Sequence, residues 1–69
     1  MQSEAIMSYV FKESKENWKM TMTGKFQLSV FYGGKMFIVK SIDRDRCREI
    51  MDQRIRQAIE LNLVEKEDN

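Results

Sequence analysis

The feature that most constrains this sequence is a pair of adjacent glycines, Gly33 and Gly34, between the runs KFQLSVFY and KMFIVK. Two successive glycines supply the positive φ angles of a two-residue type I′ or II′ turn, so residues 25–40 predict a β-hairpin. Such a loop places Tyr32 opposite Lys35, and cross-strand partners share a face of the sheet. One face is apolar almost throughout and is the expected core side, with Phe26, Leu28, Val30, Phe37 and Val39.

The opposite face of this hairpin is polar at its open end and apolar near the turn. It carries Lys25, Gln27, Ser29, Phe31, Met36, Ile38 and Lys40. A sheet with one solvated face alternates apolar and polar residues, and does not normally gather Phe31, Met36 and Ile38 on the wet side. We therefore expect another part of the chain, or another molecule, to cover these three side chains.

Two further strands are predicted before the hairpin. Residues 4–12 form the first candidate, and the polar stretch 13–17 suits a hairpin connection. Residues 18–23 then alternate with period two, as a strand does. The sequence therefore predicts up to four antiparallel strands.

The loop at Gly24 decides which face Trp18, Met20 and Met22 occupy. A two-residue loop, Thr23-Gly24, places all three on the same face as Phe31, Met36 and Ile38. A three-residue loop shifts the pairing by one and turns them toward the core. We favour the two-residue loop because X-Gly suits a primed turn, and on this interpretation both faces of the sheet are largely apolar.

From Asp43 the apolar spacing becomes helical, with Asp43 as the expected N-cap. The apolar stripe comprises Cys47, Ile50, Met51, Ile55, Ala58, Leu61 and Asn62, with Ile59 at its margin. Arg54 falls inside this stripe and is expected to extend to the rim. The helix should fray near Leu63, and residues 64–69 are predicted to be a mobile charged tail.

These elements predict a single α+β domain over residues 1–69. Its antiparallel sheet has three to four strands in the order β-β-β-β-α, with the C-terminal helix packed on one face. One helix covers only one face of a sheet. A second apolar face would therefore need cover from another segment of the chain or from another molecule.

The composition is that of a folded domain, with 42% hydrophobic and 33% charged residues. No apolar run approaches the roughly 20 residues of a membrane span, and the N-terminal residues do not resemble a signal peptide. A single cysteine, Cys47, excludes an internal disulfide framework. We expect a soluble cytoplasmic protein without a membrane partner.

The residues that most catalysis requires are missing. The chain has no histidine, so the commonest general base and metal ligand is absent. Cys47 lies at an apolar helical position, where a packed core thiol is expected. Gly33-Gly34 precedes a strand and matches no phosphate-binding loop. We expect no enzymatic activity, no cofactor and no metal site.

The uncovered sheet face is the predicted binding surface of a small interaction module: a homodimer, an adaptor or an inhibitor. Tryptophan and methionine are enriched in interface cores, and soluble monomers rarely expose large apolar patches. The predicted contact residues are Trp18, Met20, Met22, Phe31, Met36 and Ile38. The lysines expected to steer an acidic partner are Lys19, Lys25, Lys35 and Lys40. The competing interpretation is that the first strand or the termini cover this face within one chain.

A second hypothesis is nucleic-acid binding by the sheet. Three short segments within residues 18–58 carry a resemblance to a known fold: Gly24-Lys25-Phe26, Gly33-Gly34-Lys35 and Ser41-Ile42-Asp43. With them, this part of the chain resembles the arm-binding domains of tyrosine recombinases and the plant AP2-type fold. That resemblance implies a three-stranded sheet that enters a DNA groove. Such sheets present several arginines, whereas this one offers lysines beside methionine and isoleucine, which predicts weak, salt-limited binding.

A third hypothesis places a partner on the exposed helix face. Its mixed charges are Arg44, Arg48 and Arg56 with Asp45, Asp52 and Glu60. Ordinary solvation also explains such a face. A partner docked there should dissociate with salt, whereas one held by the apolar sheet face should not.

Overall fold

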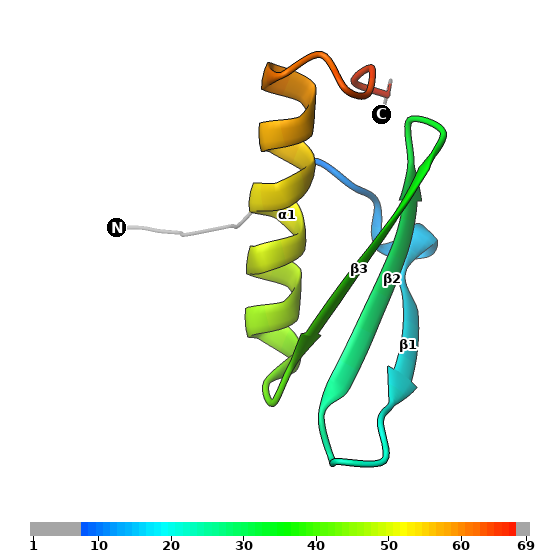
Figure 1. The fold of residues 1–69 in the computed structure, drawn as a ribbon, viewed down its shortest axis with the longest axis vertical. Coiled ribbons are helices and arrows are strands. Elements are labelled where there is room, and N and C mark those ends of the chain that lie inside the picture. Colours follow the sequence, from blue (N-terminus) through cyan, green and yellow to red (C-terminus); the bar gives the residue numbers. More distant parts are fainter. Residues whose placement is uncertain (1–7, 68–69) are drawn as a thin grey trace.

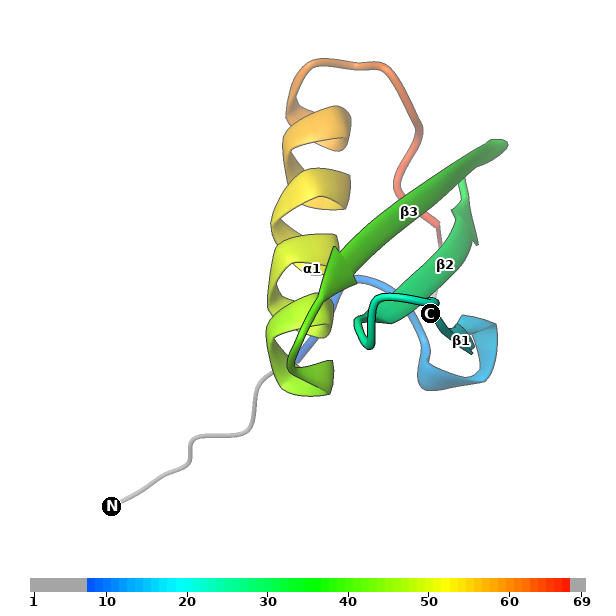
Figure 2. The ribbon, with the colours of Figure 1, turned by 60° about the horizontal axis from the view of Figure 1, so that its bottom comes forward.

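The computed structural model describes residues 8–67 of the chain. Its elements in order are the 3₁₀ turn η1 (Glu13–Lys15), the strands β1 (Asn17–Met20), β2 (Phe26–Tyr32) and β3 (Lys35–Ser41), and the helix α1 (Arg44–Glu60). The strands form one antiparallel sheet in the order β1-β2-β3. The helix α1 lies along one side of it, as two views show (Figures 1 and 2). The predicted α+β class is confirmed.

The β2–β3 hairpin has the predicted turn and register. Gly33 and Gly34 have φ angles of 57° and 84°, and two positive values are what a type I′ turn requires. Tyr32 pairs with Lys35, and the pairing continues unbroken along both strands. The expected core side is also confirmed: Leu28, Val30 and Val39 are buried, and Phe26 and Phe37 pack against them.

The β1–β2 connection is a three-residue loop, so the favoured two-residue loop is wrong. The Thr21 N–H donates to the Lys25 carbonyl at 2.8 Å, and the Thr21 carbonyl accepts from the Gly24 N–H at 3.0 Å. The Thr21 hydroxyl accepts a further bond from the Lys25 N–H at 3.0 Å. Gly24 has a φ of 83°, which is the left-handed position that follows a type I turn in such hairpins. The threonine side chain therefore stabilises a loop one residue longer than the Thr-Gly pair suggested.

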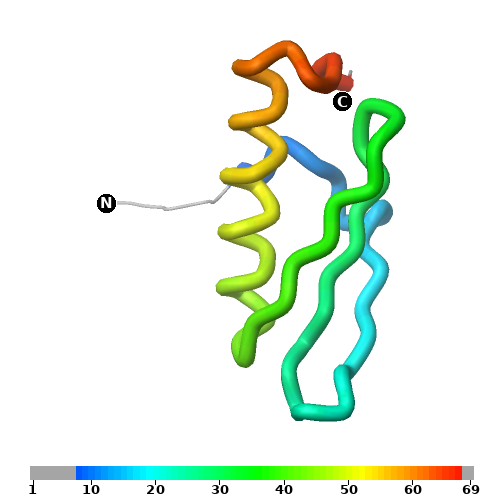
Figure 3. Tube along the Cα trace, viewed as in Figure 1, coloured from blue at the N-terminus to red at the C-terminus, as the bar shows by residue number. Residues whose placement is uncertain are grey.

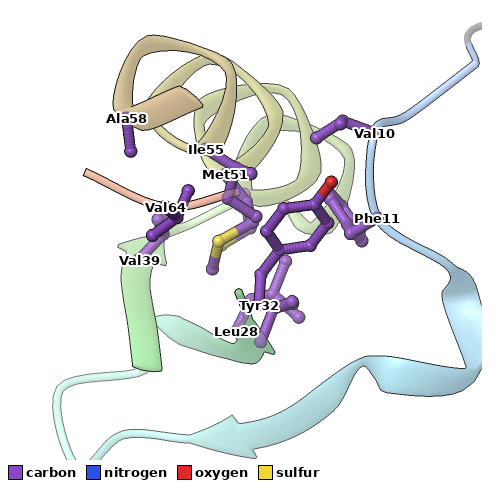
Figure 4. Close-up of a cluster of buried hydrophobic side chains, with 11 residues drawn as sticks. Val10, Phe11, Leu28, Tyr32, Val39, Met51, Ile55, Ala58 and Val64 are labelled. Carbon is purple, nitrogen blue, oxygen red and sulfur yellow. The ribbon is translucent and has the colours of Figure 1, made fainter. Parts of the chain in front are cut away.

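The predicted first strand does not form within residues 8–12; residues 4–7 lie outside the described part of the chain. The Val10 N–H donates to Asp52 Oδ1 on α1 at 2.6 Å. Val10 and its neighbour Phe11 are both buried, whereas a strand on a sheet face buries alternate residues. The segment instead lies between the helix and the sheet (Figure 4).

Both ends of α1 are capped. Asp43 is the N-cap as predicted, with Oδ1 accepting from the Asp45 N–H at 3.0 Å. Asn62 has a φ of 60°, and the Leu63 N–H donates to the Ala58 carbonyl at 2.9 Å, which together form a Schellman motif. The helix buries Cys47, Met51, Ile55 and Ala58 of the predicted stripe, whereas Leu61 and Arg54 are exposed.

The chain beyond α1 turns back to the β2–β3 turn (Figure 3) and completes the core. Val64 is 7% exposed and lies near Val39 and Met51 (Figure 4). A Cβ on Gly33 would stand only 2.8 Å from the Val64 Cβ, so this glycine permits both the turn and the close approach. Mobility of residues 64–69 stays a prediction, but Val64 is a core residue.

Candidate functional site

The sheet face that α1 does not cover consists of three cross-strand rows, which we call the outer face. Their order runs from the β1–β2 loop toward the β2–β3 turn. The rows are Lys19–Gln27–Lys40, Asn17–Ser29–Ile38 and Phe31–Met36. The outer face thus changes from polar to apolar along the strands, as the hairpin pattern predicted.

The apolar end of the outer face is the strongest candidate for a contact surface. Phe31, Met36 and Ile38 are 52%, 56% and 50% exposed. Phe31 and Met36 are a cross-strand pair, and Ile38 lies one row along. No segment within residues 8–67 buries these side chains. This group is therefore open to contact in the described part of the chain.

The other three predicted contact residues do not lie on the outer face. Trp18 pairs with Leu28 and Met20 pairs with Phe26, so both share the core side with their partners. The one-residue shift of the β1–β2 register turned them there, because a slip by one reverses every side chain of a strand. Met22 lies in the loop and is fully exposed. A binding role for these three residues stays a prediction; their placement beside Phe31 was wrong.

Trp18 is instead held in a network that ties β1 to α1. Its indole Nε1 donates to Glu16 Oε1 at 2.9 Å, and Arg48 Nε donates to Glu16 Oε2 at 2.9 Å. The Glu16 side chain is only 6% exposed, and this hydrogen bond raises the pKa of Arg48. The Arg44 guanidinium lies 4.7 Å from the centre of the Trp18 ring, and Phe26 meets that ring edge-on at 6.3 Å. Glu16 thus links Trp18 of the edge strand β1 to Arg48 of α1.

Lysine is the only charged residue type in the sheet: the three strands contain no aspartate, glutamate or arginine. Lys19 and Lys40 flank Gln27 across the outer face, and Lys25 directly precedes β2 with the same alternation. Lys35 pairs with Tyr32, so its side chain lies on the same face as Tyr32, at the tip of the hairpin, and not on the outer face. The outer face is cationic at one end and apolar at the other.

The charges of the helix face are largely used within the chain. Arg56 Nε donates to Asp52 Oδ2 at 2.8 Å, and Arg56 also donates to the Ser8 carbonyl at 3.1 Å. Arg48 is bound to Glu16. The third hypothesis therefore has fewer free charges to offer a partner than the sequence suggested.

The described residues offer little to chemistry. Cys47 is fully buried, and burial raises the pKa of its thiol, so the expected core thiol is confirmed. No group of three or more His, Cys, Asp or Glu side chains within residues 8–67 could hold a metal ion. No helix in this part of the chain is long and apolar enough to cross a membrane.

Glu67 is a structural residue that sequence reasoning missed. Its Oε2 accepts from the Gly33 N–H at 2.8 Å, and its Oε1 accepts from Lys15 Nζ at 3.0 Å. Its own N–H donates to the Tyr32 hydroxyl at 2.8 Å. These bonds fasten the C-terminal segment to the tip of the hairpin that carries Phe31 and Met36. No sequence pattern marks a glutamate whose principal partner is a backbone amide.

Comparisons with protein-family models, curated proteins and solved structures found no significant match. The surface of the molecule is therefore the source of evidence about its function.

The hydrogen bonds from Gly33 and Lys15 to the Glu67 carboxylate, which we call the Glu67 clasp, should break in acid. The Gly33 N–H and then Lys15 lower the pKa of Glu67 from the ordinary 4.5. A carboxyl group whose pKa is lower in the folded state than in the unfolded state stabilises the fold at any pH above its unfolded pKa. This contribution is lost as the pH falls through the folded pKa. The Gly33 amide resonance should therefore titrate with a midpoint below 4.5, and Glu67→Gln should abolish that titration. A Gly33 midpoint at or above 4.5, or one unchanged by the substitution, would contradict the clasp.

Proposed function

We propose that this chain is a small non-catalytic module that binds a protein partner on the outer face of its sheet. The observation that carries the proposal is the group Phe31, Met36 and Ile38, three adjacent and half-exposed apolar side chains that nothing within residues 8–67 covers. Apolar side chains gathered inside a polar rim are typical of the centre of a protein interface. A partner that covers this group removes apolar surface from water, which is the main favourable term in association.

The charge of the outer face selects the chemistry of the partner. Lys19, Lys25 and Lys40 lie at its polar end, and no acidic residue interrupts them within the strands. A partner with carboxylates beside an apolar patch would match both ends of this face, with its carboxylates at the lysines and its apolar patch at Phe31, Met36 and Ile38. Such complementarity speeds association and favours one partner over others more than it adds affinity.

The outer face is also preorganised. Phe31 stands between Val30 and Tyr32, whose side chains are 1% exposed on the opposite face. The Gly33-Gly34 turn and the Glu67 clasp hold the same end of the hairpin. A surface whose backbone is fixed from beneath loses little entropy on binding.

The direct test is to place a charge in the apolar group. Phe31→Asp should abolish capture of the partner from native extract, because a carboxylate buried opposite an apolar surface loses its hydration. Phe31 is half exposed, so the substitution should cost the fold no more than about 1 kcal/mol. Circular dichroism and the emission of Trp18, the single tryptophan, would report an intact fold.

Ile42→Asp is the matched control. Ile42 is 77% exposed in the connection between β3 and α1, away from the Phe31 group. We expect one protein to be retained by the wild type and by Ile42→Asp and lost with Phe31→Asp. Identical captured proteins on all three baits would refute the proposal. A dimer in light scattering that dissociates on Phe31→Asp would identify the partner as a second copy.

DNA binding by the same face is the second candidate, favoured by the lysine-only charge of the strands. The outer face offers Lys19, Lys25 and Lys40, so contact is limited to about three phosphates. The logarithm of the binding constant should then fall with the logarithm of salt with a slope of about −3. Fluorescence anisotropy with labelled duplex and single-stranded DNA at low salt tests this, and no change in anisotropy would exclude it.

A further inference from the structure

The turns of the sheet determine which backbone groups of β3 face away from β2. A two-residue turn is closed by a pair that exchanges both hydrogen bonds, here Tyr32 and Lys35, and such pairs alternate along an antiparallel ladder. The groups of Phe37 and Val39 therefore point to β2. Those of Met36, Ile38 and Lys40 point outward. The β1–β2 hairpin agrees with this assignment. Thr21 bonds to Lys25, so the alternating pattern directs the backbone groups of Gln27 and Ser29 to β1 and leaves those of Leu28 and Val30 for β3.

The outward edge of β3 is free. The strand lies at the margin of the sheet, and no hydrogen bond within residues 8–67 reaches the outward N–H or C=O of Met36, Ile38 or Lys40. The edge is seven residues long, with no proline, glycine or break in its register. Native edges of this length are normally shortened, bulged, covered or protected by charged side chains, because an open one is a template for another strand. Here lysines stand only near the two ends of the strand, at Lys35 and Lys40.

The two sides of this edge, the outer face and the side of α1, differ in chemistry. On the outer face the edge is flanked by Met36 and Ile38, both half exposed. On the other side lies α1, whose Arg48 and Asp52 face β1 and the N-terminal segment. Helical geometry then turns Arg54 to the opposite flank of α1, which is the side of β3 because the strand order is β1-β2-β3.

Arg54 is exposed and forms no ion pair with any residue in the described part of the chain. Its position in the otherwise apolar stripe is the irregularity noted in the sequence. Ile50 and Leu61 accompany it on the same flank by the same geometry. An incoming strand would therefore meet apolar side chains on one face, and a guanidinium between apolar side chains on the other.

We propose that the partner's contact segment is an extended strand of alternating apolar and acidic residues that pairs with the free edge of β3. Its apolar side chains extend the Phe31–Met36–Ile38 group, and its carboxylates face Arg54. Main-chain hydrogen bonds to Met36, Ile38 and Lys40 supply the affinity, and alternate side chains supply the choice of sequence. This inference rests on the proposed function and specifies how the partner binds.

Charge disfavours a second copy of β3 as the occupant. Both edges of such a pair would carry Lys35 and Lys40 with Arg54 above them, and neither strand would contribute an acid. Like charges at one seam oppose association. An acidic strand meets no such penalty.

The test uses a capped octapeptide of alternating valine and glutamate, titrated into the isotopically labelled full chain and followed by amide exchange. The peptide should protect the amides of Met36, Ile38 and Lys40, while those of Phe37 and Val39 are protected with or without it. N-methylation of alternate peptide residues, on the edge that faces β3, should weaken binding about tenfold or more. A valine–lysine octapeptide should not bind.

Ile38→Pro removes one outward N–H and no bond of the β2–β3 ladder, and Ile38→Ala is its control with a similarly shortened side chain. Both variants lose most of the apolar side chain of Ile38, so the lost N–H should appear as affinity about tenfold weaker for Ile38→Pro than for Ile38→Ala. If it does not fold, the N-methylated peptide on the wild type decides the question.

The inference is overturned by absence of binding, by equal affinity for the N-methylated peptide, or by binding without protection of the three amides. It is also overturned if those amides are already protected in a dimer of the free chain. Failure of the outer-face proposal looks different: Phe31→Asp would then leave partner capture unchanged while the edge amides still respond to the peptide.

Discussion

The pairing of Trp18 with Leu28 is the contact on which the rest of the structure depends. Each side chain of a strand follows its register, so this one pair decides that β1 adds its aromatic residue to the core side. The Thr21 bonds at the loop and the Glu16–Arg48 pair across to α1 hold the register at both ends of the strand. The sheet consequently has one apolar face and one mixed face, rather than two apolar faces.

The need to complete a small core explains why nothing between residues 8 and 67 covers the mixed face. A single helix is too narrow to close the core side of a three-stranded sheet. Val10 and Phe11 before the sheet, and Val64 after the helix, fill the remaining space on that side. Val10, Phe11 and Val64 are therefore engaged with the core. Phe31, Met36 and Ile38 stay about half exposed in this part of the chain, beside the edge strand β3.

The sequence was most informative where local chemistry alone decides structure. Two glycines sufficed for the β2–β3 turn and its register, and so for the outward direction of Phe31; Asp43 likewise marked the start of α1. The β1–β2 register depended on hydrogen bonds of the Thr21 side chain, which Thr-Gly does not reveal. Residues 8–12 could not be assigned from their pattern, because consecutive buried residues occur only where a segment lies between two layers. The Glu67 contact joins residues 34 positions apart and leaves no local signal.

The most direct measurement of this account is the set of Hα–Hα nuclear Overhauser effects between β1 and β2. Non-hydrogen-bonded pairs of an antiparallel sheet bring their Cα atoms to about 4.5 Å, the closest approach in the ladder. With Thr21 bonded to Lys25, the non-bonded pair at the tryptophan is Trp18–Leu28, and a strong effect between these two Hα protons is predicted. A strong effect between Lys19 and Leu28 instead would show the two-residue loop. It would return Trp18 to the outer face and contradict the account.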